Sequence, residues 1–164
     1  ASFAENNYDL KHDAGYDTSY GLSFSTDAVS QCSKSSTDFT VYYSGYSTDF
    51  KHSSDKNCYN AFIDGDEYID GGNNSSIDFA NVIVLNIPSQ TVDGYGRQAM
   101  EMTGSGSGYF FTGGKYVEIN WERADRADNF HYTLKDGTPL NLSIGKTFIS
   151  IAPLDSTKGL IFNG

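Results

Sequence analysis

Apolar and polar side chains alternate along much of this chain with the two-residue period of β-strands. The clearest case is Lys115–Trp121, in which the apolar residues from Val117 onward occupy alternate positions. A second run, Tyr109–Thr112, precedes it, and only Gly113 and Gly114 separate the two. Glycine tolerates the positive φ that both central positions of a type I′ turn require. The pattern therefore predicts a β-hairpin with one buried face.

Other segments are predicted to be strands on the same or a related pattern. Asn81–Ile87 is nearly continuous in branched aliphatic residues, which is typical of a strand buried on both faces at the centre of a sheet. Pro88 cannot donate a ladder hydrogen bond and so ends this strand. The remaining predicted strands are Tyr20–Ser25, Asp38–Ser44, Tyr59–Ile63, Arg97–Thr103, Phe130–Leu134 and Thr147–Ala152, the last with Ile149 and Ile151 turned inward.

The intervening segments are predicted to be turns, loops or a short helix. Gly45–Asn57 is rich in Ser, Asp and Lys, so we expect a solvated excursion there. The Gly-Ser alternation of Gly104–Gly108 predicts a bulge or a bend at which the chain changes direction. Asp136-Gly137 is a second hairpin signal. Ser25–Ser36 has room for one or two helical turns.

Together these elements predict a mainly β fold with little helix. The expected architecture is a single domain of antiparallel strands, arranged as a sandwich or a strongly bent sheet. A length of 164 residues fits one compact domain. Residues 1–19 are polar with little periodicity and are predicted to be an N-terminal arm or the end of a linker, followed by the β-rich domain over residues 20–164. Because the chain begins with Ala1, we expect a mature or trimmed product.

The charge balance excludes nucleic acid as a partner. Twenty-one Asp and Glu residues against eleven Lys and Arg give a net charge of −10. A field of this sign repels phosphate backbones and anionic membrane surfaces, and the basic residues are scattered rather than gathered into a patch. No segment approaches the run of roughly 20 apolar residues that spans a bilayer. No transmembrane helix is therefore predicted.

Cys32 and Cys58 are the two cysteines of the chain. In an exported protein they would form a disulfide that closes a loop of about 27 residues and adds on the order of 3 kcal/mol in the chain-entropy model. In a reducing compartment they would remain free thiols. The spacing alone leaves both alternatives open, because it does not give the separation of their Cα atoms.

No residue pattern indicates a catalytic group, a metal ion or a cofactor. Asp64–Gly71 lacks the Gly and Glu positions of an EF-hand loop and is predicted to be an acidic turn. His12, His52 and His131 lie outside metal-ligand spacings, and His131 is expected to point outward from its strand. No serine lies in a G-x-S-x-G elbow. Paired carboxylates of the glycosidase type stay open as an alternative, because acidic residues are numerous.

Two groups of residues are candidates for a binding surface. Trp121 and Arg123 share one side of a strand, and Trp and Arg are frequent interface anchors. The alternative is that Trp121 fills the core and Arg123 extends from its rim. Tyr42 and Tyr46, with Tyr43 between them, form an aromatic group suited to stacking on sugars or packing on a partner, although adjacent strand residues point to opposite faces.

A series of motifs occurs in a fixed order over roughly Phe3 to Pro153: Tyr59–Asp70, Asn81-Val82-Ile83-Val84, Gly104–Tyr109, the Trp121 strand ending in Glu122-Arg123, Asp136-Gly137 with Pro139 and Leu140, Gly145-Lys146-Thr147 and Pro153. This series resembles the C-terminal domain of the YerB-like lipoproteins, a bacterial family of unknown function. The two departures from the family pattern are Ala61, where an Arg is usual, and Phe148, where a Trp is usual.

The resemblance implies a domain held outside the cytoplasmic membrane by a lipid anchor that lies outside this chain. It also implies an N-terminal partner domain that the chain lacks, and it brings no activity. We therefore expect a non-catalytic, extracytoplasmic domain that binds protein or a cell-wall component and needs no cofactor. The competing hypothesis is a hydrolase that cleaves cell-wall glycan or peptide with surface carboxylates. A third hypothesis is a structural spacer.

Overall fold

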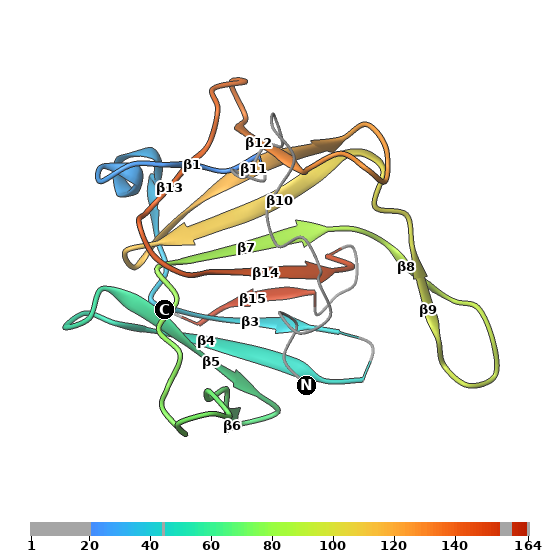
Figure 1. The fold of residues 1–164 in the computed structure, drawn as a ribbon, viewed down its shortest axis with the longest axis horizontal. Coiled ribbons are helices and arrows are strands. Elements are labelled where there is room, and N and C mark those ends of the chain that lie inside the picture. Colours follow the sequence, from blue (N-terminus) through green and yellow to red (C-terminus); the bar gives the residue numbers. More distant parts are fainter. Residues whose placement is uncertain (1–20, 44, 155–158, 164) are drawn as a thin grey trace, which may run out of the picture.

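Two β-sheets dominate the computed structural model, which describes residues 21–43, 45–154 and 159–163 (Figure 1). The predicted N-terminal arm, residues 1–19, lies outside the described residues. The large sheet contains, in order, β12 (His131–Leu134), β11 (Lys115–Arg123), β10 (Gly104–Thr112), β7 (Asn81–Asn86) and β14 (Thr147–Ala152), with β2 (Lys34–Ser35) also paired to β11. The small sheet contains β15 (Leu160–Phe162), β3 (Asp38–Tyr42), β4 (Ser47–Ser53), β5 (Cys58–Ile63) and β6 (Asp66–Glu67).

Two short strand pairs and one 3₁₀ helix complete the described chain. The strands β1 (Ser23–Phe24) and β13 (Asn141–Leu142) form a parallel pair, and β8 (Ser89–Thr91) and β9 (Gln98–Met100) form an antiparallel ribbon that projects from the sheets in Figure 1. The 3₁₀ helix η2 (Ala28–Gln31) lies within the segment predicted to contain a helical turn. Within the described ranges there is no α-helix, and no helix long and apolar enough to cross a bilayer. The predicted mainly β domain is confirmed.

The two sheets share an aromatic core, which makes the fold a sandwich. Phe39 of the small sheet stacks on Phe111 of the large sheet, with ring centroids 3.7 Å apart. Phe39 also stacks on Phe50 at 4.9 Å. We call this cluster the inter-sheet core; its buried members are Phe39, Val41, Phe50, Tyr59, Ala61, Phe79, Val82, Val84, Phe111 and Ala152.

A second core lies on the opposite face of the large sheet. Because successive residues of a strand point to opposite faces, Val82 and Val84 of β7 enter the inter-sheet core, whereas Ile83 and Leu85 enter this outer core. The predicted burial of this strand on both faces is therefore confirmed. The buried members of the outer core are Cys32, Ile83, Leu85, Ile87, Phe110, Ile119, Trp121, Tyr132, Leu140 and Leu142.

The hairpin at Gly113 and Gly114 has the predicted geometry. Their φ angles are +56° and +71°, both in the left-handed region that a type I′ turn requires. The turn is also packed against other segments. A Cβ at Gly113 would lie 2.8 Å from a methyl carbon of Val29, and the Gly114 carbonyl accepts a hydrogen bond of 2.9 Å from the Ser36 amide. The β10–β11 hairpin is thereby fixed to the chain around η2.

The prediction of a solvated excursion at Gly45–Asn57 is wrong, because this segment contains strand β4. Thr48 and Phe50 are buried on one face of the strand, which pairs with β3 and β5. On the other face, Asp49 accepts a hydrogen bond of 2.6 Å from the Thr40 hydroxyl. The polar composition of this segment resembles that of a loop, although a polar side chain such as Asp49 forms a hydrogen bond across the sheet.

The prediction of a bend at Gly104–Gly108 is also wrong. These residues form the first half of β10 and pair without interruption with β11, from Gly104 opposite Arg123 to Thr112 opposite Lys115. Glycine is needed here for close packing: a Cβ at Gly108 would lie 2.5 Å from the Val84 carbonyl oxygen. Gly106 and Gly108 therefore mark tight contacts within a continuous strand pair.

Of three further local predictions, two need correction and one is confirmed. Ile149 of β14 is 44% exposed, and Ser150 and Ala152 are the buried residues of this strand, which pairs in parallel with β7. The hairpin signal at Asp136-Gly137 is confirmed: Gly137 has a φ of +86°, its amide donates to the Leu134 carbonyl, and Thr133 and Pro139 form an antiparallel bridge across the turn. The first predicted strand, Tyr20–Ser25, is reduced to Ser23–Phe24 within the described residues.

Candidate functional site

The structure places the two groups of residues predicted as candidate binding surfaces on different sheets. Trp121 is 4% exposed and belongs to the outer core, where its ring packs edge-on against Phe130 at 5.6 Å. Arg123 donates to the carbonyl oxygens of Asp128 at 2.8 Å and Arg126 at 2.6 Å. Trp121 therefore fills the core, as in the second of the two alternatives, whereas Arg123 is hydrogen-bonded to the backbone of the following loop.

The predicted tyrosine group lies on the small sheet. Tyr46 is 48% exposed and stacks on Tyr43 with centroids 4.4 Å apart. The Tyr43 hydroxyl shares a hydrogen bond of 2.5 Å with the Ser150 hydroxyl. Tyr42 is half-buried and lies at the end of β3. Tyr42 and Tyr46 thus belong to a different sheet from Trp121 and Arg123, and the four residues do not form one site.

Cys32 and Cys58 are free thiols in the structure, so the disulfide alternative is not formed. Cys32 lies in the outer core, whereas Cys58 begins β5 of the small sheet. Burial raises the pKa of the Cys32 thiol to about 12. Burial, followed by the neighbouring Asp78 carboxylate, raises the pKa of the Cys58 thiol. Neither side chain is poised as a thiolate nucleophile at neutral pH.

A hollow of about 520 Å³ lies over three neighbouring strands of the large sheet. Two cross-strand rows of polar side chains line it, because the register places Ser107, Asn120 and Thr133 opposite one another, and likewise Ser105, Glu122 and His131. The backbone of this region includes Gly106 and Trp121. We call this surface, with its six polar side chains, the polar shelf.

The polar shelf is the uncovered end of the face that forms the inter-sheet core. Along β10, alternation puts Ser105 and Ser107 on the same face as Tyr109 and Phe111, which pack in that core. Tyr109 is half-buried, and its ring lies 5.8 Å from that of Phe162 on β15. The small sheet therefore covers one end of this face. The rings of Tyr109 and Phe162 form an aromatic border between the covered part and the shelf.

The side chains of the shelf have few partners within the protein. The Asn120 side-chain oxygen accepts a hydrogen bond of 2.7 Å from the Lys135 ammonium group. In the described part of the chain, the other five side chains have no hydrogen-bond or ion-pair partner; these are Ser105, Ser107, Glu122, His131 and Thr133. His131 is exposed, as the sequence predicted. Hydroxyl, amide, imidazole and carboxylate groups here remain available to a ligand as donors and acceptors.

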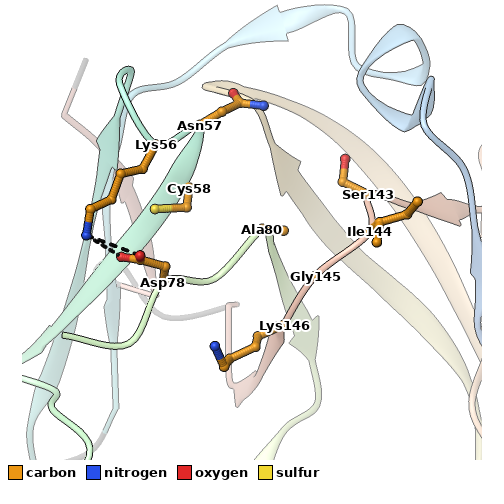
Figure 2. Close-up of a pocket in the computed structure, with 9 residues that line it drawn as sticks. All are labelled: Lys56, Asn57, Cys58, Asp78, Ala80, Ser143, Ile144, Gly145 and Lys146. Atoms are coloured by element: carbon orange, nitrogen blue, oxygen red, sulfur yellow. Dashed lines mark hydrogen bonds and ion pairs between the residues drawn. The ribbon is translucent and has the colours of Figure 1, made fainter. Parts of the chain in front are cut away.

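A second pocket, of about 500 Å³, lies between three segments of the chain (Figure 2). One wall is formed by Lys56, Asn57 and Cys58 at the start of β5, together with Asp78 and Ala80 before β7. The segment from Ser143 to Lys146 between β13 and β14 forms the opposite wall in Figure 2. We call this the inter-segment pocket.

The acidic and metal-ligating side chains of the described residues are dispersed. They contain no group of three or more His, Cys, Asp or Glu side chains placed to hold a metal ion. The predicted acidic turn contains Asp64 and Gly65, with φ angles of +50° and +92°, between β5 and β6. The polar shelf and the inter-segment pocket each contain one carboxylate, Glu122 and Asp78 respectively. Neither site therefore has the carboxylate pair of a glycosidase.

No sequence motif indicates either surface directly. The shelf arises from the register of three strands, and its residue types are ordinary polar ones. The inter-segment pocket joins residues about 90 positions apart in the chain. The polar face of Lys115–Trp121 is a sequence signal for the polar shelf. It lies opposite the apolar face from which the strand is predicted.

Comparisons with known proteins agree with this architecture. The sequence pattern of the family described as "Protein of unknown function (DUF3048) C-terminal domain" matches residues 39–149. The crystal structure of the YerB protein from Bacillus subtilis superposes with a TM-score of 0.71 at 20% sequence identity, over 87% of this chain and 47% of that chain. This chain thus spans about half the length of that protein, and the likeness concerns the fold. No curated protein matches the sequence.

Proposed function

This chain belongs to the family of the DUF3048 C-terminal domain, a domain of unknown function, and from that premise we propose that it is a non-catalytic, extracytoplasmic binding domain of a lipid-anchored cell-surface protein. The ligand that we propose is the neutral glycan of the cell wall, bound on the polar shelf. The alternative of a protein ligand on this surface is an outcome of the test below.

The observation that carries this proposal is the set of unpartnered side chains on the shelf. Sugar hydroxyls both donate and accept hydrogen bonds, and the shelf offers Ser, Thr, Asn, His and Glu side chains from three strands in register. Side chains on paired strands are held more precisely than side chains on loops. The aromatic border at Tyr109 supplies an apolar surface beside these groups, as small-molecule sites usually do.

The charge of the chain also supports a neutral ligand. A net charge of −10 repels polyanions at long range, whereas an uncharged saccharide approaches without this penalty. The carboxylate of Glu122 faces the shelf among uncharged or weakly basic neighbours, which suits hydrogen bonds from sugar hydroxyls. The absence of a carboxylate pair at the shelf gives no support to the hydrolase hypothesis.

Calorimetric titration with a soluble tetramer of β-1,4-linked N-acetylglucosamine tests the proposal. We expect binding to wild-type protein, and roughly tenfold weaker binding to the double variant Asn120→Ala/Thr133→Ala, because two hydrogen-bonding groups are lost from one row. The matched control is Gln90→Ala, which removes an exposed amide from the β8–β9 ribbon and should bind like wild type.

Several results would contradict the proposal. Equal affinity of the double variant and wild type would place the glycan elsewhere. No binding of the tetramer by any protein, together with capture of a surface protein that the double variant fails to capture, would make the shelf a protein-binding surface. Shortening of the tetramer during the titration would instead favour the hydrolase hypothesis.

A further inference from the structure

The inter-segment pocket has a rigid wall, because a buried asparagine holds the segment between β13 and β14 in place. Asn81 is fully buried; its side-chain amide donates to the Ser143 carbonyl at 2.7 Å and to the Thr147 hydroxyl at 3.2 Å. Its side-chain oxygen accepts the Ser143 amide at 2.8 Å. The Ser143 hydroxyl shares a further hydrogen bond of 2.7 Å with Thr112. The pocket is thus built on fixed backbone rather than on a free loop.

Contact with Ala80 restricts the same segment from the other side. Gly145 has a φ of +144°, and a Cβ there would lie 2.7 Å from the Ala80 Cβ. Only glycine fits this position without displacing its neighbour. Ile144 and Lys146, on either side of Gly145, both line the pocket, and the backbone that carries them is restricted at Gly145.

One positive charge of the pocket is already neutralised. Lys56 lies 3.1 Å from both carboxylate oxygens of Asp78, and the Asn60 amide donates to the same carboxylate at 3.0 Å. These hydrogen bonds, with Asn60 and then Lys56 the largest contributors, lower the pKa of Asp78. Asp78 is consequently ionised at neutral pH and fully occupied by its partners.

The second positive charge has no such partner. Among the described residues, the Lys146 ammonium group forms no ion pair or hydrogen bond. The lining therefore carries a net charge of +1, from Lys56 and Lys146 against Asp78, in a chain whose net charge is −10. An unpaired cation beside a fixed wall favours a ligand with one negative charge.

Apolar groups stand next to this cation. Ile144 is 70% exposed and therefore offers an aliphatic surface to a ligand at the mouth of the pocket. Ala80 and the thiol of Cys58, which its raised pKa keeps neutral, add small apolar surface to the lining. A ligand suited to these neighbours has a carboxylate on a small aliphatic body.

We propose that the inter-segment pocket binds the C-terminal carboxylate of a peptide that ends in a small aliphatic residue, with Lys146 paired to the carboxylate and Ile144 packed on the aliphatic group. The site is separate from the polar shelf and does not depend on glycan binding. The terminal residue of a peptide supplies both a carboxylate and an aliphatic group, because its carboxylate and side chain leave the same carbon atom.

A titration followed by two-dimensional amide NMR tests this site with N-acetyl-alanine as the probe and N-acetyl-alanine amide as its uncharged analogue. We expect N-acetyl-alanine to shift the amide signals of 56–58 and 144–146, and the uncharged analogue to leave them unchanged. Lys146→Gln should weaken binding of the acid roughly fivefold, the upper range for a solvent-screened charge pair. Lys51→Gln removes an exposed lysine outside the pocket and should bind as wild type does.

Equal shifts with the acid and the amide would overturn the proposal, because the carboxylate would then make no difference. Equal weakening by the two lysine variants would show a general charge effect and would overturn it as well. Ile144→Ser provides a second test of the aliphatic contact: a folded variant with unchanged affinity for the acid would remove Ile144 from the site.

Discussion

Gly106 lies directly opposite Trp121 in the β10–β11 pair, and the indole of Trp121 occupies the space that a side chain at Gly106 would need. A Cβ built on Gly106 would lie 2.7 Å from the indole Nε1 and 2.8 Å from two ring carbons. Such distances are shorter than real contacts, so the ring or the strand would have to move. The burial of Trp121 in the outer core thus depends on a glycine in the neighbouring strand.

Gly106→Ala should therefore destabilise the protein by about 1–3 kcal/mol, the usual cost of overpacking. Urea unfolding followed by the fluorescence of Trp121, the single tryptophan of the chain, measures this change. Gly94→Ala is the control, because a Cβ at that exposed position meets no atom within 4 Å. A Gly106→Ala protein as stable as the control would show that the ring adapts without cost.

Asn81→Ala should lower the free energy of unfolding by about 1–3 kcal/mol, because it leaves buried polar groups of the Ser143 backbone without partners. The same substitution should perturb the amide signals of 143–147 more than those of the β10–β11 hairpin. Asn129→Ala removes a half-buried asparagine whose side chain has no hydrogen-bond partner among the described residues. If both variants lose the same stability, Asn81 has no special role in holding the segment.

Stability should fall as the pH rises from about 9 toward 12. The Cys32 thiol has its pKa raised by burial to about 12, so the folded state keeps a proton that the unfolded chain releases above about pH 9. The free energy of unfolding then decreases with pH, by up to about 1.4 kcal/mol per pH unit for one such group. Burial also raises the pKa of Tyr132 to about 12, which extends the decline above pH 10.

Cys32→Ala separates the cysteine from the tyrosines in this pH dependence. Between pH 9 and 10 the slope of unfolding free energy against pH should be smaller in the variant, whatever its stability at neutral pH. Urea unfolding at several pH values gives both slopes. Identical slopes would contradict the assignment of the alkaline decline to the Cys32 thiol.

Asp78→Asn should change the free energy of unfolding by less than about 1 kcal/mol, although it removes a visible ion pair. The side chains of Lys56 and Asp78 are 55% and 40% exposed, so water screens their attraction. Urea unfolding at low and high salt checks this expectation. A loss of several kcal/mol would mean that the ion pair stabilises the β4–β5 region, in addition to setting the net charge of the pocket.

Local patterns were sufficient for the elements that local residues determine. The two glycines of the β10–β11 turn and the aliphatic run of β7 appear in the structure as predicted. The signals in these cases lie within the element itself, in glycine conformational freedom and in hydrophobic periodicity.

Elements stabilised by distant residues were predicted less well. Strand β4 has a loop-like composition, but Thr40 of the neighbouring strand provides the partner for Asp49. The glycines of β10 resemble a bend in sequence, yet Trp121 and the Val84 carbonyl are what require them. The inward position predicted for Ile149 failed because β14 lies at the edge of the large sheet.

The candidate sites depend even more on long-range arrangement. The strand that carries Trp121 was identified from sequence, but the prediction concerned its apolar face, which is buried in the outer core. The polar shelf results from the register of three strands and from the place where the small sheet stops covering their face. Neither can be read from any one segment of the sequence.

Amide NMR of the wild-type protein locates the bound glycan and so decides whether the polar shelf is its binding site. With the N-acetylglucosamine tetramer, the account predicts saturable shifts concentrated at 105–107, 120–122 and 131–133, and little change in the small sheet. Saturable shifts confined to the Tyr43–Tyr46 turn or the β8–β9 ribbon, with the shelf signals unmoved, would contradict it.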